Sequence, residues 1–354
     1  MNEERILLAH GSGGKLSHDL IENIFLKAFY NPILSPLSDQ AVFASPAGRL
    51  AMTTDSYVVN PIFFPGGDIG KLAVCGTVND LAVGGAMPLY MSVSFIIEEG
   101  MPVEDLKKIV RSMADAAKSC GVTIVTGDTK VVEKGKGDNI FINTTGVGVV
   151  KDGINLSPSF IRPGDAVIVS GTIGDHGMAI LKERGGFDIP VVSDCAPLHE
   201  LVRDILSTDA GIRAMRDPTR GGLATILNEF ADSSGHAILI EEEKIPVKEA
   251  VKGACELLGF DPLYLANEGK IVVVTSKDSS ERVLDAMRKN PLGNNAAVIG
   301  SVIGGSVIGG SVIGGSVARG GVNPPARPRV LLATAFGNTR VVEKLTGEQL
   351  PRIC

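Results

Sequence analysis

The sequence predicts an α/β protein of the α+β type, with two domains that each pair a β-sheet with helices on one outer face, followed by a flexible C-terminal tail. The chain has 354 residues, of which 44% are hydrophobic and 21% charged, enough for about two globular domains of roughly 100 to 200 residues each. Helix-like and strand-like patterns alternate along it, and a turn-rich break over residues 151–164 separates two similar halves.

The first half contains two amphipathic stretches and four strand-like runs. A helix is predicted over residues 17–31, with Ser17 as its N-terminal cap. A second helix is predicted over residues 102–121, where Gly121 is the stop signal. Runs of apolar and β-branched residues predict strands over residues 49–59, 90–99, 121–132 and 139–150.

The second half repeats this scheme. Strands are expected over residues 165–174, 237–243, 270–277 and 296–302, and helices over residues 199–206, 221–235, 248–259 and 279–290.

Residues 296–318 are uncharged over nearly the length of a transmembrane helix. Their repeat, SVIGG, has a period of five residues, which turn a helix through about 500°, so that the glycines do not line one face. On a strand, an odd period changes face at each copy. We interpret residues 301–329 as a low-complexity repeat and linker, and expect no membrane partner.

Composition excludes several classes of protein. The net charge is −6 and the basic residues are not clustered, so nucleic acid is not an expected partner. The N-terminus lacks the apolar stretch of a signal peptide. The cysteines are odd in number and widely spaced, without metal-binding spacing, which favours a reducing cytoplasm; they are Cys75, Cys120, Cys195, Cys255 and Cys354.

Carboxylates follow apolar runs at four glycine- or threonine-rich stretches. These are Asp55 in TTDSYV, Asp80 in GTVNDLAVGG, Asp128 in VTGDTK and Asp217 in RDPTRGG. An aspartate of this kind, taken alone, is more often a turn former or a helix cap than a catalytic residue. Together with Lys71 and Lys130 they indicate a site for Mg²⁺ and phosphate, because Mg²⁺ takes oxygen ligands and shares them with phosphates. HGSGGK and GDIGK do not match the P-loop pattern, although amides of a glycine-rich turn also bind phosphate.

A specific resemblance rests on seven motifs: HGSGGK, FFPGGDIGKLAVCGTVNDLAVGGAMP, VTGDTKVV, SGTIGDHGMAIL, RDPTRGGL, LANEGK and the terminal LPRIC. With them the chain resembles the HypE family of hydrogenase maturation proteins, carbamoyl dehydratases in the superfamily that also contains aminoimidazole ribonucleotide synthetase and selenophosphate synthetase. The resemblance runs from about His10 to Cys354, and LPRIC is its most diagnostic part. The SVIGG block is the main departure from the family pattern.

The resemblance implies the fold of aminoimidazole ribonucleotide synthetase and a homodimer formed by the N-terminal sheets. The implied organisation is an ATP-binding and dimerisation domain over residues 1–155, a C-terminal α/β domain over 156–305, the repeat and linker over 301–329, and a tail carrying the reactive cysteine over 330–354.

The resemblance also implies an activity. In such proteins the C-terminal thiolate accepts a carbamoyl group from the carbamoyltransferase HypF, and ATP dehydrates the S-carboxamide to an S-cyanide. The cyanide then reaches the iron of [NiFe] hydrogenase through the HypC–HypD complex. Phosphorylation of the amide oxygen turns a poor leaving group into a good one, which requires a base and Mg²⁺-bound ATP.

Residue roles follow from the same resemblance. Cys354, Lys130 and Glu268 are the expected catalytic residues. Expected contacts to ATP and Mg²⁺ are Asp55, Lys71, Asn79, Asp80, Asp128, Thr129 and Asp217, with the four aspartates as metal ligands.

Each role has a plainer alternative. The plainer role of Glu268 is a cap or an ion pair with Lys270, and that of Lys130 is a solvated charge at a strand end. For His176, a turn residue and a nucleotide contact are about equally expected. For Cys354, prenylation needs a cysteine four residues from the end, a disulfide is disfavoured in a reducing compartment, and companion metal ligands are missing. These exclusions leave a covalent carrier. Two other functions stay open: another ATP-dependent synthetase of the superfamily, or a non-catalytic scaffold whose tail is a docking peptide.

Overall fold

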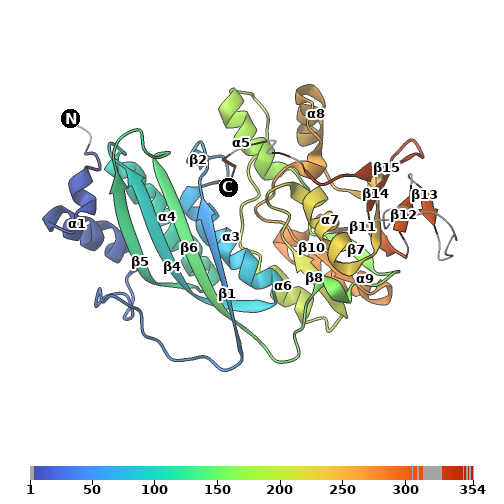
Figure 1. Cartoon of the computed structure of the whole chain (residues 1–354), viewed down its shortest axis with the longest axis horizontal. Helices are drawn as coiled ribbons and strands as arrows, with labels where there is room; N and C mark the ends of the chain where they lie inside the picture. Colours follow the sequence, from blue (N-terminus) through green and yellow to red (C-terminus); the bar gives the residue numbers. More distant parts are fainter. Residues whose placement is uncertain are drawn as a thin grey trace, which may run out of the picture.

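The computed structural model describes residues 4–304, 306–308, 311–313, 329–345, 347, 350 and 352–353. Two sheet-and-helix halves lie side by side, and helix α3 (Ile69–Val83) lies between them (Figure 1). Cys354 and most of the predicted repeat and linker are outside the described residues. Within the described part of the chain, no helix combines the length and the apolar character needed to cross a membrane.

The N-terminal half has a four-stranded sheet in the order β1-β6-β4-β5, in which only β4 and β5 are parallel. Helices α3 and α4 pack on one face of this sheet. The other face exposes apolar side chains from β1 and β4: Leu50, Met52, Met87 and Ile96. The strands are β1 (Arg49–Tyr57), β4 (Ala86–Glu98), β5 (Thr123–Val132) and β6 (Ile140–Val150), and α4 spans Val103–Cys120.

The N-terminal segment closes the inner face of the sheet near β5. The Phe25 ring stacks on Phe95 with centroids 4.8 Å apart. This segment runs through α1 (Lys15–Leu20), a π-helical stretch (Ile21–Leu26) and α2 (Lys27–Phe29).

Helix α3 begins at a strong cap. The Asp68 carboxylate accepts hydrogen bonds from the backbone N–H groups of Gly70 and Lys71, at 2.7 and 3.1 Å. Almost all of the helix is buried. Gly76 allows close packing on β1, since a Cβ there would lie 2.2 Å from the Tyr57 hydroxyl oxygen. The sequence does not predict this helix, because a helix buried on all sides lacks an amphipathic pattern.

The C-terminal half has a seven-stranded sheet in the order β15-β14-β9-β11-β7-β10-β8. Its central strands are buried on both faces: Val167 and Val169 pack with α7, whereas Ile168 packs with α6 and α9. The expectation of helices on one face is therefore wrong for this half, because strands that are apolar on both sides need cover on both. The strands are β7 (Ala166–Val169), β8 (Ile212–Arg216), β9 (Ala237–Glu241), β10 (Val272–Thr275), β11 (Ala297–Ile303), β14 (Val330–Ala333) and β15 (Thr339–Val342).

The helices of this half fall into three groups. Helix α7 covers one face of the sheet, α6 and α9 cover the other, and α5 and α8 contact each other beside it. Their bounds are α5 (Asp175–Gly185), α6 (His199–Leu206), α7 (Gly222–Ser234), α8 (Glu249–Leu258) and α9 (Ser280–Lys289).

The glycine-rich repeat starts inside the sheet. Strand β11 includes Ser301, Val302 and Ile303 from the first SVIGG copy, and it pairs with β7 and β9. This copy is therefore part of the fold rather than a linker. Next along the chain, β12 (Ser306–Ile308) and β13 (Ser311–Ile313) pair with each other as a separate hairpin.

Candidate active site

Two carboxylates meet where α3 packs on β1. Thr53 and Asp55 are alternate residues of β1, so they share the face that α3 covers. The Thr77 hydroxyl of α3 donates to the Asp55 carboxylate at 3.0 Å, and the Thr53 hydroxyl donates to the Asp80 carboxylate at 2.8 Å. Because positions 77 and 80 lie on one face of a helix, α3 brings Asp80 beside Asp55.

Two further carboxyl groups come from the C-terminal half. Asp217 follows β8 and is buried; burial raises its pKa to about 7, and the charges of Asp80 and Asp55 act in the same direction. The pKa of Glu268 is raised well above its usual range. Burial is the largest cause, and Cys195 and Asp217 raise it further. Among the described residues, no group forms a hydrogen bond with Glu268 Oε1. The two halves thus place acidic groups against one another, and their repulsion adds to burial in raising the pKa values of Asp217 and Glu268.

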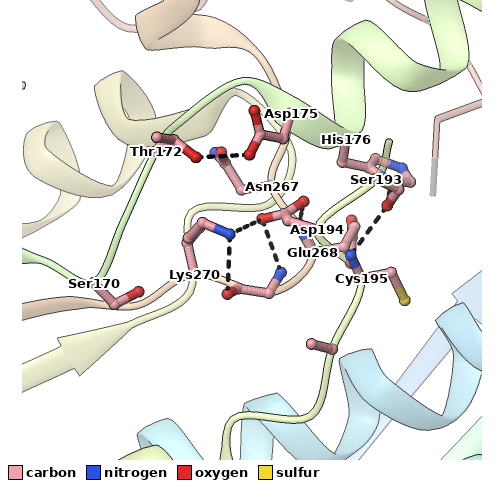
Figure 2. A network of polar contacts seen from close by, with 12 residues as sticks. Ser170, Thr172, Asp175, His176, Ser193, Asp194, Cys195, Asn267, Glu268 and Lys270 are labelled. Atoms are coloured by element: carbon pink, nitrogen blue, oxygen red, sulfur yellow. Dashed lines mark hydrogen bonds and ion pairs between the residues drawn. The ribbon is translucent and has the colours of Figure 1, made fainter. Parts of the chain in front are cut away.

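The turn that carries Glu268 is held by a buried ion pair (Figure 2). Lys270 Nζ lies 3.0 Å from Asp194 Oδ2. The backbone N–H groups of Glu268 and Gly269 donate to the same carboxylate, at 3.1 and 3.2 Å. Burial alone would raise the pKa of Asp194, but the Lys270 charge, followed by the N–H donor of Glu268, lowers it by more. Lys270 is therefore the partner of Asp194.

Asn79 joins α3 to the C-terminal half. Its side-chain amide donates to the carbonyl groups of Ala196 and Glu268, at 3.2 and 3.4 Å, and its oxygen accepts from the N–H of Leu198 at 2.7 Å. The expected nucleotide contact thus binds backbone groups across the interface. Lys71, in the first turn of α3, donates to the carbonyl of Gly66 at 2.8 Å.

Asp128, Thr129 and Lys130 lie at the opposite edge of the sheet from Asp55. They belong to β5, whereas Asp55 belongs to β1. Asp128 lies opposite Ser94 of β4 in the register of the sheet, and both Asp128 and Lys130 are exposed. A single chain therefore does not bring Asp128 to the other three predicted metal ligands. Among the described residues, no three His, Cys, Asp or Glu side chains are grouped closely enough to hold one metal ion.

A cavity of about 540 Å³ lies between β5 and the N-terminal segment. Its lining includes His10, Gly11 and Gly13 of the HGSGGK motif, together with Asp128 and Lys130. The cavity thus joins two motifs that the sequence associates with phosphate.

The end of the tail is bound by His176, in the first turn of α5. His176 Nε2 lies 2.8 Å from the carbonyl oxygen of Ile353, and Nδ1 lies 2.8 Å from Ser193 Oγ. A carbonyl only accepts, so Nε2 carries the proton. Burial lowers the pKa of His176 and keeps the ring neutral. The sequence singled out His176 but gave no signal for this partner.

The internal cysteines are all buried, as the apolar runs around them predict. Burial raises the pKa of Cys120 and of Cys255 to about 11. At neutral pH both are thiols rather than thiolates, and they are poor nucleophiles.

Family comparisons define the class of protein. Residues 37–150 match the family model of the N-terminal domain of AIR synthase related proteins, and residues 162–313 match the model of the C-terminal domain. Together these segments span most of the chain, and the two sheet-and-helix halves correspond to them.

Closer relatives identify the family within this class. The chain is 52% identical to carbamoyl dehydratase HypE of Cupriavidus necator, over 99% of this chain and 95% of the relative. It is 46% identical to carbamoyl dehydratase HypE of Escherichia coli, over 99% of both chains. A crystal structure of HypE in complex with ATP matches with a TM-score of 0.89 and 48% identity, covering 98% of this chain and 99% of that one. The chain belongs to the HypE family of carbamoyl dehydratases.

Proposed function

We propose that this chain uses ATP to dehydrate an S-carboxamide on Cys354 to an S-cyanide, after a HypF-type carbamoyltransferase has supplied the carbamoyl group. The cyanide then passes to the iron of [NiFe] hydrogenase through a HypC–HypD complex. The observation that carries the proposal is the contact between His176 and Ile353, the residue before Cys354. Ser193 binds His176 while its neighbour Asp194 binds the Glu268 turn, which connects the end of the tail to the acidic cluster.

Relatives support the substrate and the partner. A solved relative is described as HypE in complex with ATP. Another is described as a HypE–HypF complex, and it matches with a TM-score of 0.76 and 49% identity, covering 92% of this chain and 99% of that one. The odd number of widely spaced cysteines favours a cytoplasmic location.

The acidic cluster suits a magnesium-bound triphosphate. Burial raises the pKa of Asp55, and the charge of Asp80 raises it further, which is the repulsion that a cation removes. Mg²⁺ needs only one or two protein carboxylates when phosphate and water supply the rest, so one or two of Asp55, Asp80 and Asp217 suffice as its protein ligands. Bound Mg²⁺ supplies charge stabilisation during transfer of a phosphoryl group to the carboxamide oxygen.

Glu268 suits the role of proton acceptor. A carboxyl with a raised pKa is a stronger base once it is ionised, and Oε1, which has no hydrogen-bond partner in the described part of the chain, suits acceptance of a proton from the amide nitrogen. Asn79 and the Asp194–Lys270 pair hold the backbone of this turn in place.

We also propose that a second copy covers the exposed face of the N-terminal sheet. Leu50 and Met52 are 62% and 74% exposed there, a large apolar area for a monomer surface. Ile96 and Lys130 are paired neighbours near the other edge of that face. A two-fold dimer through this face offers a route to combine Asp128 and Lys130 of one copy with the acidic cluster of its partner.

The test compares wild-type protein with Cys354→Ser. After incubation with the carbamoyltransferase and carbamoyl phosphate, the C-terminal peptide should gain about 43 Da, and ATP should then remove about 18 Da. Cys354→Ser should fold and bind ATP but yield no cyanide, because a hydroxyl is far less nucleophilic than a thiol. Thiocyanate from the variant, or an adduct on an internal cysteine, would overturn the proposal. ATP turnover that needs no modified tail would favour another synthetase, and absence of turnover would favour the docking scaffold.

A further inference from the structure

The end of the tail is held by hydrogen bonds to its backbone. His176 donates to the carbonyl of Ile353. The guanidinium of Arg184 donates to the carbonyl of Arg352 and, at 2.5 Å, to the carbonyl of Asn60. The N–H of Asn60 also donates to the carbonyl of Arg352, at 3.2 Å. Two consecutive peptide groups of the tail are therefore bound from both halves of the molecule.

Side chains of the tail add two contacts. Ile353 is 5% exposed and packs with the core of the N-terminal half. Arg352 forms an ion pair with Asp138 at 3.1 Å, on the exposed side of the interface. The side chain of Cys354 is not needed for any of these interactions, since all of them involve residues before it.

We propose that His176, Arg184 and Asn60 form a tail seat, a set of positioning residues that holds the end of the chain in the interface while the modified thiol reacts. This inference rests on the proposed function. Because the tail seat binds backbone groups, it accepts the free thiol, the carbamoylated form and the cyanide equally. It thus holds the substrate without selecting for its modification state.

A second consequence concerns access to the thiol. A tail bound in the seat is withheld from a carbamoyltransferase. The affinity of the seat for the tail therefore sets which fraction of the molecules is ready for dehydration and which fraction is available for carbamoyl transfer. Weakening the seat should slow dehydration and should not slow carbamoyl transfer. Damage to the fold would slow both.

Alkylation tests the tail seat without ATP or any partner protein. Native full-length protein is treated with iodoacetamide, and alkylation of Cys354 is followed by peptide mass spectrometry, with the buried Cys75 and Cys195 as monitors of unfolding. His176→Asn should alkylate Cys354 about tenfold faster than wild type, the effect of one hydrogen bond. His176→Gln should stay near the wild-type rate, because the longer amide brings an N–H to the position of Nε2.

Arg184→Ala provides an independent variant should His176→Asn not fold. It should also speed alkylation about tenfold. Lys182→Ala is the matched control, since it removes from the same helix a cation that forms no hydrogen bond or ion pair with the described residues of the tail. Equal alkylation rates in wild type, His176→Asn and Arg184→Ala would overturn the tail seat.

Single-turnover dehydration of carbamoylated protein gives the second readout. The rate should fall in His176→Asn and recover in His176→Gln, while ATP affinity stays unchanged. A loss of dehydration without faster alkylation would mean that His176 acts elsewhere and would reject the seat. Failure of the proposed function alone would leave the alkylation result intact, so the two failures are distinguishable.

Discussion

The ammonium of Lys270 lies 3.0 Å from the carboxylate of Asp194, and the two side chains are only 11% and 3% exposed. Gly269 packs so closely on this segment that a Cβ there would lie 1.9 Å from the carbonyl oxygen of Asp194. The Asn-Glu-Gly-Lys turn therefore needs a glycine for packing and a lysine for charge. Together they hold the turn that presents Glu268.

Asp194→Asn should lower the free energy of unfolding by about 3–5 kcal/mol, because it leaves the Lys270 ammonium buried without a counter-charge. The pKa of Asp194 is lowered in the folded state. Its ionised form thus adds stability above the unfolded pKa of about 4, and this contribution is lost as the pH falls further. Urea unfolding at pH 7 and pH 3 measures both effects.

Glu104→Gln is the control for that experiment. It removes the partner of Lys107 in an exposed ion pair of 2.6 Å, which is worth less than about 1 kcal/mol. If Asp194→Asn and Glu104→Gln lower the free energy of unfolding by the same amount at pH 7, the buried pair does not stabilise the turn.

Asp217→Asn should stabilise the ligand-free protein at high pH. The pKa of Asp217 is raised to about 7 by burial and then by Asp80. Between about pH 4 and pH 7 the unfolded chain releases this proton while the folded chain retains it, so wild-type stability falls as the pH rises. The amide removes this penalty, which is on the order of 4 kcal/mol at pH 8 for a pKa that lies about three above its unfolded value and little at pH 4. Thermal unfolding of the variant and the wild type at pH 8 and pH 4 measures the effect. A difference in Tm between the two proteins that is equal at both pH values would contradict the prediction.

Asp80→Asn should abolish ATP turnover and leave the fold intact. The amide oxygen of asparagine still accepts the hydrogen bond that Thr53 donates to Asp80, but the negative charge needed for Mg²⁺ is lost. Phosphate release measures turnover, and circular dichroism monitors the fold. The exposed Asp115→Asn is a control of equal charge change. Turnover at the wild-type rate would remove Asp80 from the metal site.

Local patterns predicted the elements that have a polar face. The amphipathic helix α4 ends at Cys120, with Gly121 at a φ of +68°, as its pattern indicates. Helix α3 was missed because almost every residue in it is buried, so no period is visible. The C-terminal sheet was predicted with one covered face because strands alone do not show on which sides helices will pack.

The site could be predicted only in part, because it depends on contacts between distant residues. Each aspartate was identified from its neighbours along the chain. The strand order that separates Asp55 from Asp128 is a property of the whole sheet. Likewise His176 meets a tail residue 177 positions away, and no local pattern specifies such a partner.

The repeat allows two deletions that differ by one side chain in the sheet. Deleting Ser306–Gly315 removes two SVIGG copies and leaves β11 (Ala297–Ile303) intact. We expect a change in unfolding free energy below about 0.5 kcal/mol, because loop-closure entropy varies slowly with length.

Deleting Ser301–Gly315 instead joins Gly300 to the sequence Ser-Val-Ala, so the strand keeps its pattern except that alanine replaces the partly buried Ile303. The longer deletion should therefore cost about 1–2 kcal/mol, less than truncation of a fully buried isoleucine. Ile303→Ala in the full-length chain should reproduce that loss in urea unfolding. A loss from the shorter deletion as large as that from the longer one would show that the later copies contribute to the fold.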